Sequence, residues 1–193
     1  MMAAIGKLAV YCGSATGHDP AHLAVARELG DLLASRGIGL VYGGGKLGLM
    51  GAIADAVLAA GGQACGVIPS ALVGHEVAHA GLSELHVVAD MHQRKAKMTQ
   101  LADGFLCLAG GIGTMDEMLE AWTWNALGYH AKPLCLLNAA GYWDRFLAFC
   151  DHVRDEGFMS AARREQLLCA DTVEEALVRL EAAARTAREG PVW

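Results

Sequence analysis

Short apolar runs alternate with amphipathic segments along almost the whole chain. In the longer segments apolar residues recur every three or four positions, which is typical of helices that bury one face, whereas the short continuous runs indicate buried strands. Strands are predicted at Lys7–Cys12, Gly39–Tyr42, Ala64–Pro69, Leu85–Ala89, Phe105–Leu108 and Pro133–Leu137. Helices are predicted at Pro20–Arg36, Gly48–Ala60, Asp90–Ala102, Thr114–Leu127, Trp143–Glu156 and Thr172–Arg188.

Strands that alternate with helices are typical of a parallel sheet with crossover helices on both faces. We therefore expect an α/β fold: a Rossmann-like, doubly wound, mostly parallel sheet, with residues 1–193 in a single nucleotide-binding domain and a loose tail from about residue 187. Ligands of such sheets bind beyond the carboxyl ends of the strands. Glycine turns follow three predicted strands there, at Cys12-Gly13-Ser14, Gly43–Gly48 and Gly110–Gly113.

Composition narrows the class of protein. The chain of 193 residues is 54% hydrophobic, with 24 glycines and 4 prolines, as suits a buried sheet joined by tight turns. Its formal net charge of −6 argues against nucleic acid or an anionic membrane as partner. No apolar run reaches the length of a membrane span, and the start of the chain enters a strand without a secretory signal. The six scattered cysteines are expected to be reduced core thiols of a cytoplasmic protein.

The segment from Ala109 to Glu117 is the most informative stretch. Its glycines lie between a predicted strand and a helix, where bare backbone N–H groups and the helix dipole favour a bound phosphate. Thr114 can add a hydroxyl, and Glu117 places a carboxylate one turn further into the helix. Alternatively, Thr114 and Glu117 form a simple capping box. Asp116 and Glu120 are expected to be solvated helix residues, and Trp122, Trp124 and Tyr129 core or subunit-contact residues.

Gly43, Gly45 and Gly48 satisfy the G-x-G-x-x-G dinucleotide fingerprint between a strand and a helix. Phosphate or sugar contact and a tight turn with close helix packing explain these glycines equally well. NAD binding is the weaker interpretation, because the motif follows the second strand. The next strand, Ala64–Pro69, also ends without the acidic residue that would hold a ribose.

Two further motifs carry polar side chains. His75-Glu76-Val77-Ala78-His79 matches the H-E-x-x-H zinc signature, but Gly74 and Gly81 bracket it. A loop near the ligand, with Glu76 as a hydrogen-bond acceptor, is the favoured interpretation.

The second motif opens a helix directly after a strand. Asp90 is predicted to cap this helix, with Gln93 closing the capping box. Arg94 shares a helix face with Met98 and Leu101, which points its guanidinium inward toward an anionic partner. The alternative is an ordinary arginine that extends to solvent beside Lys95.

Together these segments resemble the LOG family, the cytokinin riboside 5′-monophosphate phosphoribohydrolases. Two hallmarks carry the resemblance, a P-G-G-x-G-T-x-x-E segment and an M-H-x-R-K segment, matched here by Gly110–Glu117 and Met91–Lys95. Ala109 replaces the proline that opens the first hallmark. Further matching stretches are Tyr11–Ser14, Val41–Gly45, Gly48–Gly51, Gly66–Pro69, Thr123-Trp124 and Leu137–Tyr142.

The resemblance implies hydrolysis of the N-glycosidic bond of an N6-modified adenosine 5′-monophosphate, giving free base and ribose 5-phosphate. It implies a homodimer or larger assembly with sites completed across the subunit interface, and no metal or redox cofactor. Arg94 and Glu117 would be the catalytic pair, and replacing either is expected to abolish most turnover in a folded protein. The substrate site would include Glu76, Arg94, Lys95, Gly110, Gly111, Ile112, Gly113, Thr114, Met115, Asp116, Glu117 and Thr123, with further phosphate or sugar contacts from Gly13, Ser14, Gly43, Gly44 and Gly45.

Three alternatives stay open. The first is a broader nucleosidase that cleaves AMP and similar nucleotides. The second is a carrier that holds a nucleotide or cofactor without transforming it, although a carrier has no need of both Arg94 and Glu117. The third is an NAD oxidoreductase, which the missing acidic residue disfavours.

Overall fold

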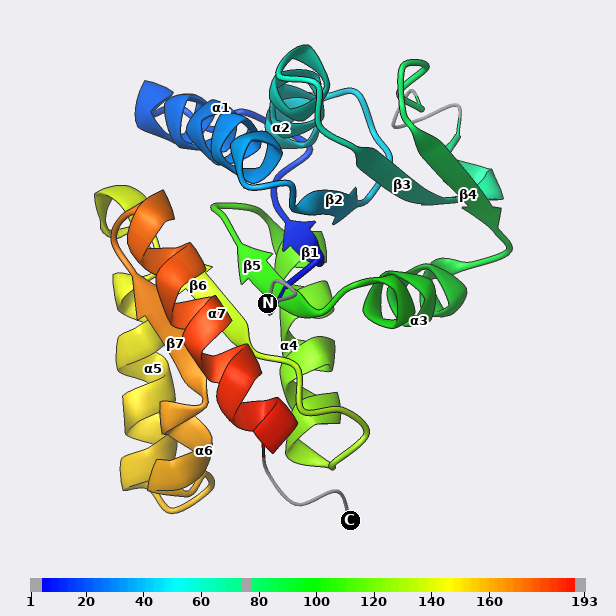
Figure 1. Ribbon diagram of the computed structural model, residues 1–193. Helices are drawn as coiled ribbons and strands as arrows, with labels where there is room; N and C mark the ends of the chain where they lie inside the picture. Colours follow the sequence, from blue (N-terminus) through cyan, green and yellow to red (C-terminus); the bar gives the residue numbers. More distant parts are fainter. Residues whose placement is uncertain (1–4, 74–77, 190–193) are drawn as a thin grey trace.

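The computed structural model describes residues 5–73 and 78–189. Seven strands form one sheet in the order β4-β3-β2-β1-β5-β6-β7 (Figure 1). Every neighbouring pair in this sheet is parallel. The strands are β1 (Lys7–Tyr11), β2 (Gly39–Tyr42), β3 (Ala64–Pro69), β4 (Glu84–Val88), β5 (Gly104–Cys107), β6 (Leu134–Leu137) and β7 (Leu167–Ala170).

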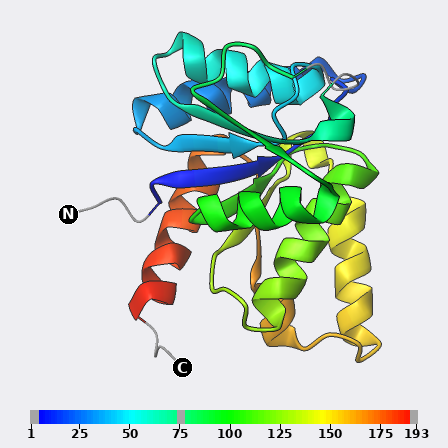
Figure 2. The same ribbon diagram turned by 90° about the vertical axis from the view of Figure 1, so that its right-hand side faces the viewer.

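Helices cover both faces of the sheet, which confirms the predicted Rossmann-like fold class. The helices α1 (Pro20–Ser35), α2 (Gly48–Ala59) and α7 (Val173–Glu189) share one core with the sheet. The helices α3 (Met91–Leu101), α4 (Ile112–Ala126) and α5 (Asp144–Asp155) lie on the other face (Figure 2). Short helices complete the chain: η1 (Ser70–Leu72), η2 (Ala139–Gly141) and α6 (Ala161–Glu165).

The two cores follow from the alternation of side chains along each strand. In β1, Leu8 and Val10 enter the α1 side, whereas Ala9 and Tyr11 enter the α3 side. All six cysteines are free thiols, five of them buried, as expected. No helix among the described residues is both long and apolar enough to span a bilayer.

The strand order reverses between β1 and β5. The chain moves outward from β1 to β4 at one edge and then returns, so that β5 pairs with β1 on its other side. The loops that leave the carboxyl ends of β1 and β5 therefore diverge to opposite faces, and ligands of open α/β sheets bind at this point.

Some boundaries differ from the predicted ones. The strand β7 and the short helix α6 were not predicted, and α7 continues to Glu189, beyond the expected start of the tail. The helix α4 begins at Ile112, two residues before the predicted start. As a result, Thr114 lies inside α4 rather than at its start.

Candidate active site

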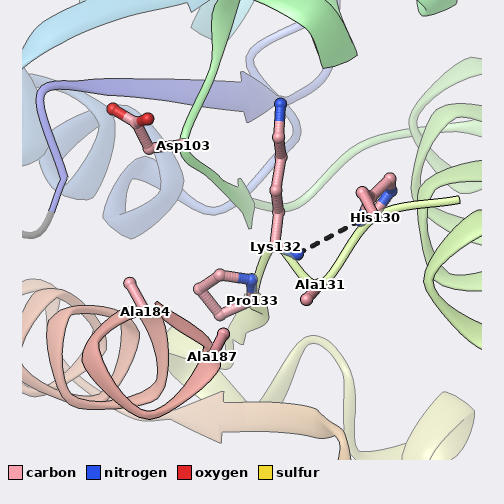
Figure 3. Close-up of a pocket in the computed structure, with 7 residues that line it drawn as sticks. All are labelled: Asp103, His130, Ala131, Lys132, Pro133, Ala184 and Ala187. Carbon is pink, nitrogen blue, oxygen red and sulfur yellow. Dashed lines mark hydrogen bonds between the residues drawn. The ribbon is translucent and has the colours of Figure 1, made fainter. Parts of the chain in front are cut away.

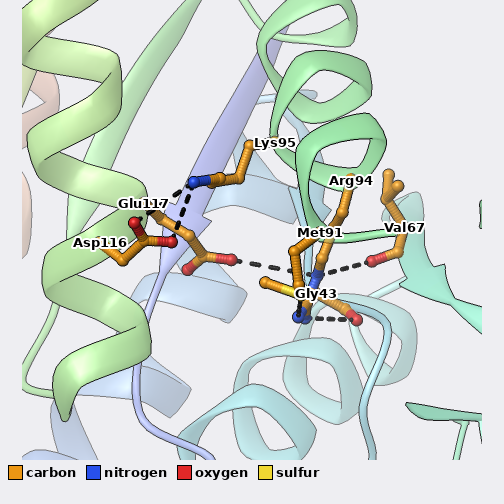
Figure 4. Close-up of polar contacts among 7 residues, drawn as sticks. All are labelled: Gly43, Val67, Met91, Arg94, Lys95, Asp116 and Glu117. Atoms are coloured by element: carbon orange, nitrogen blue, oxygen red, sulfur yellow. Dashed lines mark hydrogen bonds and ion pairs between the residues drawn. The ribbon is translucent and has the colours of Figure 1, made fainter. Parts of the chain in front are cut away.

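Arg94 is buried on α3, with only 4% of its surface exposed. Its Nε donates to the carbonyl oxygen of Val67 at 3.0 Å, and its Nη2 donates to that of Gly43 at 2.9 Å (Figure 4). These carbonyls lie on β3 and directly after β2, two adjacent strands of the sheet. Asp90 caps the helix, its Oδ1 accepting from the N–H of Gln93 at 2.8 Å. The inward orientation is confirmed, and the interpretation of Arg94 as a solvent-exposed arginine is wrong.

Glu117 faces Arg94 from the neighbouring helix α4. Its Oε1 lies 4.0 Å from Nε of Arg94, and 9% of the residue is exposed. In Figure 4 the carboxylate points across the space between α3 and α4 toward the guanidinium. This contact is an ion pair rather than a short hydrogen bond. It places an acid and a permanent cation together at the carboxyl end of the sheet.

The capping-box interpretation of Thr114 and Glu117 is wrong. Gly111 is the N-cap of α4, with an extended backbone and no side-chain capping bond. The helix therefore starts before Thr114, and both residues lie inside it, where they are buried. A Cβ on Gly110 would come within 2.1 Å of the Thr114 hydroxyl oxygen, so Gly110 is needed to make room for that side chain.

The remaining residues at the start of α4 face open space. Gly111, Ile112 and Gly113 are exposed, and a Cβ on either glycine would meet no atom within 4 Å in the part of the chain that the structure describes. The side chain of Ile112 is 83% exposed. The first N–H groups of a helix have no partner within the helix. The start of α4 therefore offers backbone donors and a positive helix end to an anion.

Lys95 forms a second ionic bridge between α3 and α4. Its Nζ lies 3.0 Å from Oδ2 of Asp116 and 2.8 Å from Oε2 of Glu120. Burial alone lowers the pKa of Lys95, but its hydrogen bonds to Glu120 and Asp116 outweigh that effect and raise the pKa. The two acidic residues that were expected to be merely solvated thus hold Lys95 as an ammonium ion.

A cavity of about 580 Å³ lies on the α1 side of the glycine loop. Its size is in the range of small-molecule sites. The loops after β1 and β5 line it, and Gly13 N–H donates to Ala109 O at 3.0 Å between them. Sequence reasoning missed two lining residues, His22 and Tyr142; the Tyr142 hydroxyl donates to Gly110 O. Ser14 is exposed on the cavity wall. The Arg94–Glu117 pair lies on the α3 side of the loop.

The first backbone N–H groups of α2 already have a hydrogen-bond acceptor within the protein. The N–H groups of Leu49 and Met50 donate to the carbonyl oxygen of Gly13 at 3.0 and 3.4 Å. A Cβ on Gly48 would lie 2.3 Å from the carbonyl carbon of Ser14. Gly48 therefore serves close packing, and the dinucleotide interpretation finds no open helix start here.

Gly43 and Gly44 are buried, and both carbonyls accept bonds from the protein. Gly43 O accepts from Arg94, and Gly44 O accepts from the N–H of His79 at 3.0 Å. Gly45 is buried beside them and forms an isolated antiparallel bridge to Ala78. Substrate contact at these three glycines stays a prediction.

His79 has a structural environment. Its Nε2 lies 2.9 Å from Oδ1 of Asp55, and its Nδ1 accepts from the N–H of Gly81 at 3.1 Å. Both ring nitrogens are thus engaged, which accounts for the second histidine of the H-E-x-x-H match without a metal. His75 and Glu76 lie outside the described residues, so the role of Glu76 stays a prediction.

Thr123 lies apart from the other predicted site residues. It is exposed on α4 and lines a separate hollow of about 350 Å³ together with Trp122 and Phe158. Met115 is half-buried on the same helix, nearer its start. Within one chain, the structure brings Arg94, Lys95, Asp116, Glu117 and the glycine loop together, but not Thr123.

Another hollow, of about 200 Å³, lies at the opposite ends of the strands (Figure 3). Asp103, His130 and Lys132 line it beside the amino ends of β5 and β6. Burial lowers the pKa of Lys132 and lowers that of His130 to about 4, so that the imidazole is neutral at pH 7. Because ligands of this fold class bind at the carboxyl ends, this hollow is not the candidate site.

Gly43→Ala should reduce activity by displacing Arg94. A Cβ at this position would lie 2.0 Å from Nη2 of Arg94 and 3.0 Å from Sδ of Met50, so the guanidinium must move. We expect kcat to fall by about 10²-fold, as when a positioned group is lost, and stability to fall by about 1–3 kcal/mol from overpacking.

Steady-state rates and thermal unfolding would measure both effects. Gly39→Ala, at the amino end of the same strand, is the matched control. Its Cβ would meet the flexible Lys7 side chain at 3.3 Å and the carbonyl oxygen of Gly6 at an ordinary contact distance of 3.7 Å. Equal activity in the two variants would contradict this role of Gly43.

Comparison with known proteins places the chain in a family. A family model described as "Possible lysine decarboxylase" matches residues 50–180. The chain is 46% identical to the probable cytokinin riboside 5′-monophosphate phosphoribohydrolase LOGL1 of Oryza sativa subsp. japonica, over 95% of this chain and 82% of that protein. It is 44% identical to the phosphoribohydrolase LOG of the same organism, over 97% of this chain and 77% of that protein. The chain belongs to the LOG family.

A solved structure supports the fold of this LOG-family chain. The Moco carrier protein of Chlamydomonas reinhardtii superposes with a TM-score of 0.71 over 93% of this chain and 98% of that chain. At 22% identity, this likeness concerns the fold alone.

Proposed function

We propose that this LOG-family protein hydrolyses the N-glycosidic bond of cytokinin riboside 5′-monophosphate, giving the free base and ribose 5-phosphate. Its curated relatives at 44–46% identity carry that activity in their names. The observation that carries the proposal for this chain is the buried pair of Arg94 and Glu117 beside an exposed helix start. An anion-binding helix start with a carboxylate one to two turns further along the helix suits a sugar phosphate.

The 5′-phosphate would bind at the start of α4. The exposed backbone at Gly111–Gly113 provides donors, and the helix dipole favours a negative charge there. Glu117 lies five residues beyond Ile112, about 7.5 Å along the helix axis at 1.5 Å per residue. Helical side chains lean toward the amino end, which brings the carboxylate closer to the phosphate. One ribose ring and its 5′ carbon can bridge this gap.

Glu117 would act on the sugar. Cleavage of a glycosidic bond builds positive charge on the ring, as in an oxocarbenium ion, and a nearby carboxylate stabilises that charge or orients the attacking water. Water supplies the hydroxyl that ends on C1 of the ribose, and the departing base retains the bonding electrons and is protonated. Arg94 would fix the carboxylate and the sugar hydroxyls, because the carbonyls of Val67 and Gly43 hold its guanidinium in place.

Lys95 is better suited to a charged role than to that of an amine nucleophile. Asp116 and Glu120 keep it as an ammonium ion, whereas formation of a Schiff base needs a neutral amine. The site thus offers no support for the lysine decarboxylase chemistry named in the family description. The site also contains the Glu117–Arg94 pair, which a passive carrier would not need.

Our proposal includes a cytoplasmic homodimer. Large apolar side chains are exposed after α4, at Leu127 (65%) and Tyr129 (75%), and between α5 and α6, at Phe158 (87%). Thr123 lines a hollow together with Phe158, apart from Glu117 of its own chain. A second subunit over these side chains would explain both features, and mass measurement in solution would test it.

Substrate turnover tests the proposed reaction directly. The protein is incubated separately with isopentenyladenosine 5′-monophosphate, with AMP and with the unphosphorylated riboside, and free base is quantified by chromatography. We expect release of base from the cytokinin nucleotide and a loss of kcat/KM of at least about 10²-fold without the phosphate, since remote binding energy positions the reacting bond.

The same assays distinguish the proposed hydrolase from the three alternative functions. Faster cleavage of AMP would indicate the broader nucleosidase, and a bound but intact nucleotide would indicate a carrier. Reduction of added NAD would indicate an oxidoreductase. Loss of the activity in a Glu117→Gln preparation would exclude a contaminating hydrolase.

A further inference from the structure

Three metal-ligating side chains meet at the β3–β4 edge of the sheet, outside the candidate active site. Cys65 of β3 pairs in register with Glu84 of the edge strand β4. His86 follows Glu84 by two positions and so lies on the same face of β4. The ligand atoms of the three residues all lie within 4.8 Å of one another.

Two of the three side chains are already in polar contact. Nε2 of His86 lies 2.8 Å from Oε1 of Glu84. The sulfur of Cys65 lies within 4.8 Å of the ligand atoms of both residues. Cys65 is buried, whereas the side chains of His86 and Glu84 are 25% and 51% exposed. The cluster thus has a buried sulfur at its base and an opening to solvent, through which an ion can enter and a water can complete its coordination.

We propose that Cys65, Glu84 and His86 form a binding site for a divalent transition-metal ion of the zinc class. One sulfur, one imidazole nitrogen and one carboxylate oxygen are typical zinc donors. Soft sulfur ligands disfavour magnesium and calcium, which prefer oxygen. Ligand atoms of a tetrahedral zinc site lie roughly 3.3–3.8 Å apart, given metal–ligand distances of about 2.0–2.3 Å. The atoms of His86 and Glu84 are closer than this, at 2.8 Å, and all three ligand atoms lie within 4.8 Å, so rotation of these two partly exposed side chains would open the space for the ion.

Binding exchanges a proton for the metal. The Cys65 thiol loses its proton to solvent, the sulfur–metal bond forms, and neutral His86 donates through Nε2. Burial, followed by the charge of Glu84, raises the pKa of the thiol to about 11, while Lys7 and Lys97 oppose the rise. A dipositive ion stabilises the thiolate far more than these lysines do, since coordinated thiols are deprotonated outright.

The bound ion would join the edge strand to its neighbour. β4 has a hydrogen-bonded partner on one side only, because it ends the sheet order. Cys65 stands two residues before Val67, whose carbonyl anchors Arg94. The ion would therefore stabilise the part of β3 that holds the guanidinium, without taking part in the reaction.

Cobalt titration of the full-length, chelator-stripped protein tests the site. Co²⁺ bound to a thiolate gives a charge-transfer band in the near ultraviolet. We expect one equivalent of Co²⁺ to bind with this band and one equivalent of Zn²⁺ to displace it, with zinc affinity measured against a chromophoric chelator.

Cys65→Ser should remove the band, and His86→Gln should weaken zinc binding by more than about tenfold, since loss of a mere hydrogen-bonding partner of a ligand already costs roughly 10–100-fold. Thermal unfolding should shift upward with Zn²⁺ only in the unsubstituted chain and in the controls.

Two control variants make the result specific. Cys169→Ser removes a half-buried thiol at the opposite edge of the sheet, and His75→Ala disrupts the H-E-x-x-H match. Both should bind metal as the unsubstituted chain does. The proposal is overturned if the unsubstituted chain binds no metal, if Cys65→Ser and His86→Gln bind normally, or if His75→Ala alone abolishes binding. Far-ultraviolet circular dichroism confirms that each variant is folded.

Discussion

Glu117→Gln should lower kcat for release of the base by about 10²–10⁴-fold, the range expected when a positioned acid–base group is lost. The amide has the shape of the carboxylate but not its charge, so it cannot stabilise the positive sugar of the transition state. The protein should remain folded, because the amide fills the same space and its oxygen can still face the Arg94 guanidinium, although loss of the buried anion lowers its stability. Steady-state release of base from the cytokinin nucleotide measures the loss, and thermal unfolding checks the fold.

A matched substitution separates this effect from a general loss of charge. Glu165→Gln changes an exposed carboxylate on α6, far along the chain from the site, and should leave kcat unchanged. If Glu117→Gln retained activity within a few-fold of the unsubstituted protein, the proposed role of Glu117 would be wrong, whatever its effect on stability.

Arg94→Lys should lower kcat/KM by about 10²–10³-fold, comparable to the loss of one oriented donor at a reacting centre. Lysine keeps the positive charge but not the planar fork of donors. It cannot donate to the carbonyls of Val67 and Gly43 and also face Glu117. Parallel measurements of turnover and of nucleotide binding would show whether substrate still binds while catalysis fails.

Arg94→Ala is the less informative variant, because Arg94 is almost fully buried. Truncation would leave two buried carbonyls without this donor and Glu117 without this cation. Breaking a buried ion pair in this way costs about 3–5 kcal/mol, so loss of activity could arise from unfolding alone. Wild-type turnover in Arg94→Lys would contradict the geometric role, since charge alone would then suffice.

The fold class follows from the sequence because a parallel sheet needs long apolar strands and crossover helices, and both leave clear patterns. β7 escaped prediction for a local reason. Its four residues, Leu167–Ala170, directly precede the acidic start of α7 and follow a helix of only five residues. Without glycine or proline on either side, the run does not stand out from its helical neighbours.

The site was predictable only in part. The spacing of Arg94, Met98 and Leu101 indicates which way the arginine points, because that depends on helix periodicity alone. Its partners depend on the order of strands, which brings the ends of β2 and β3 beneath α3. Gly43 illustrates the limit: its motif suggests ligand contact or a turn, whereas the fold uses it to make room for a guanidinium. Tyr142 likewise reaches the glycine loop from a remote segment.

The two glycine-rich helix starts, at α2 and α4, differ in whether their first backbone N–H groups are available to a ligand. Gly13 O accepts from the first amides of α2, while the first residues of α4 remain exposed. A dinucleotide carries a diphosphate bridge with two phosphoryl groups to accommodate, whereas a mononucleotide carries one. With the first amides of α2 bonded within the protein, the phosphate site proposed at the start of α4 would favour compounds with a solitary phosphoryl terminus.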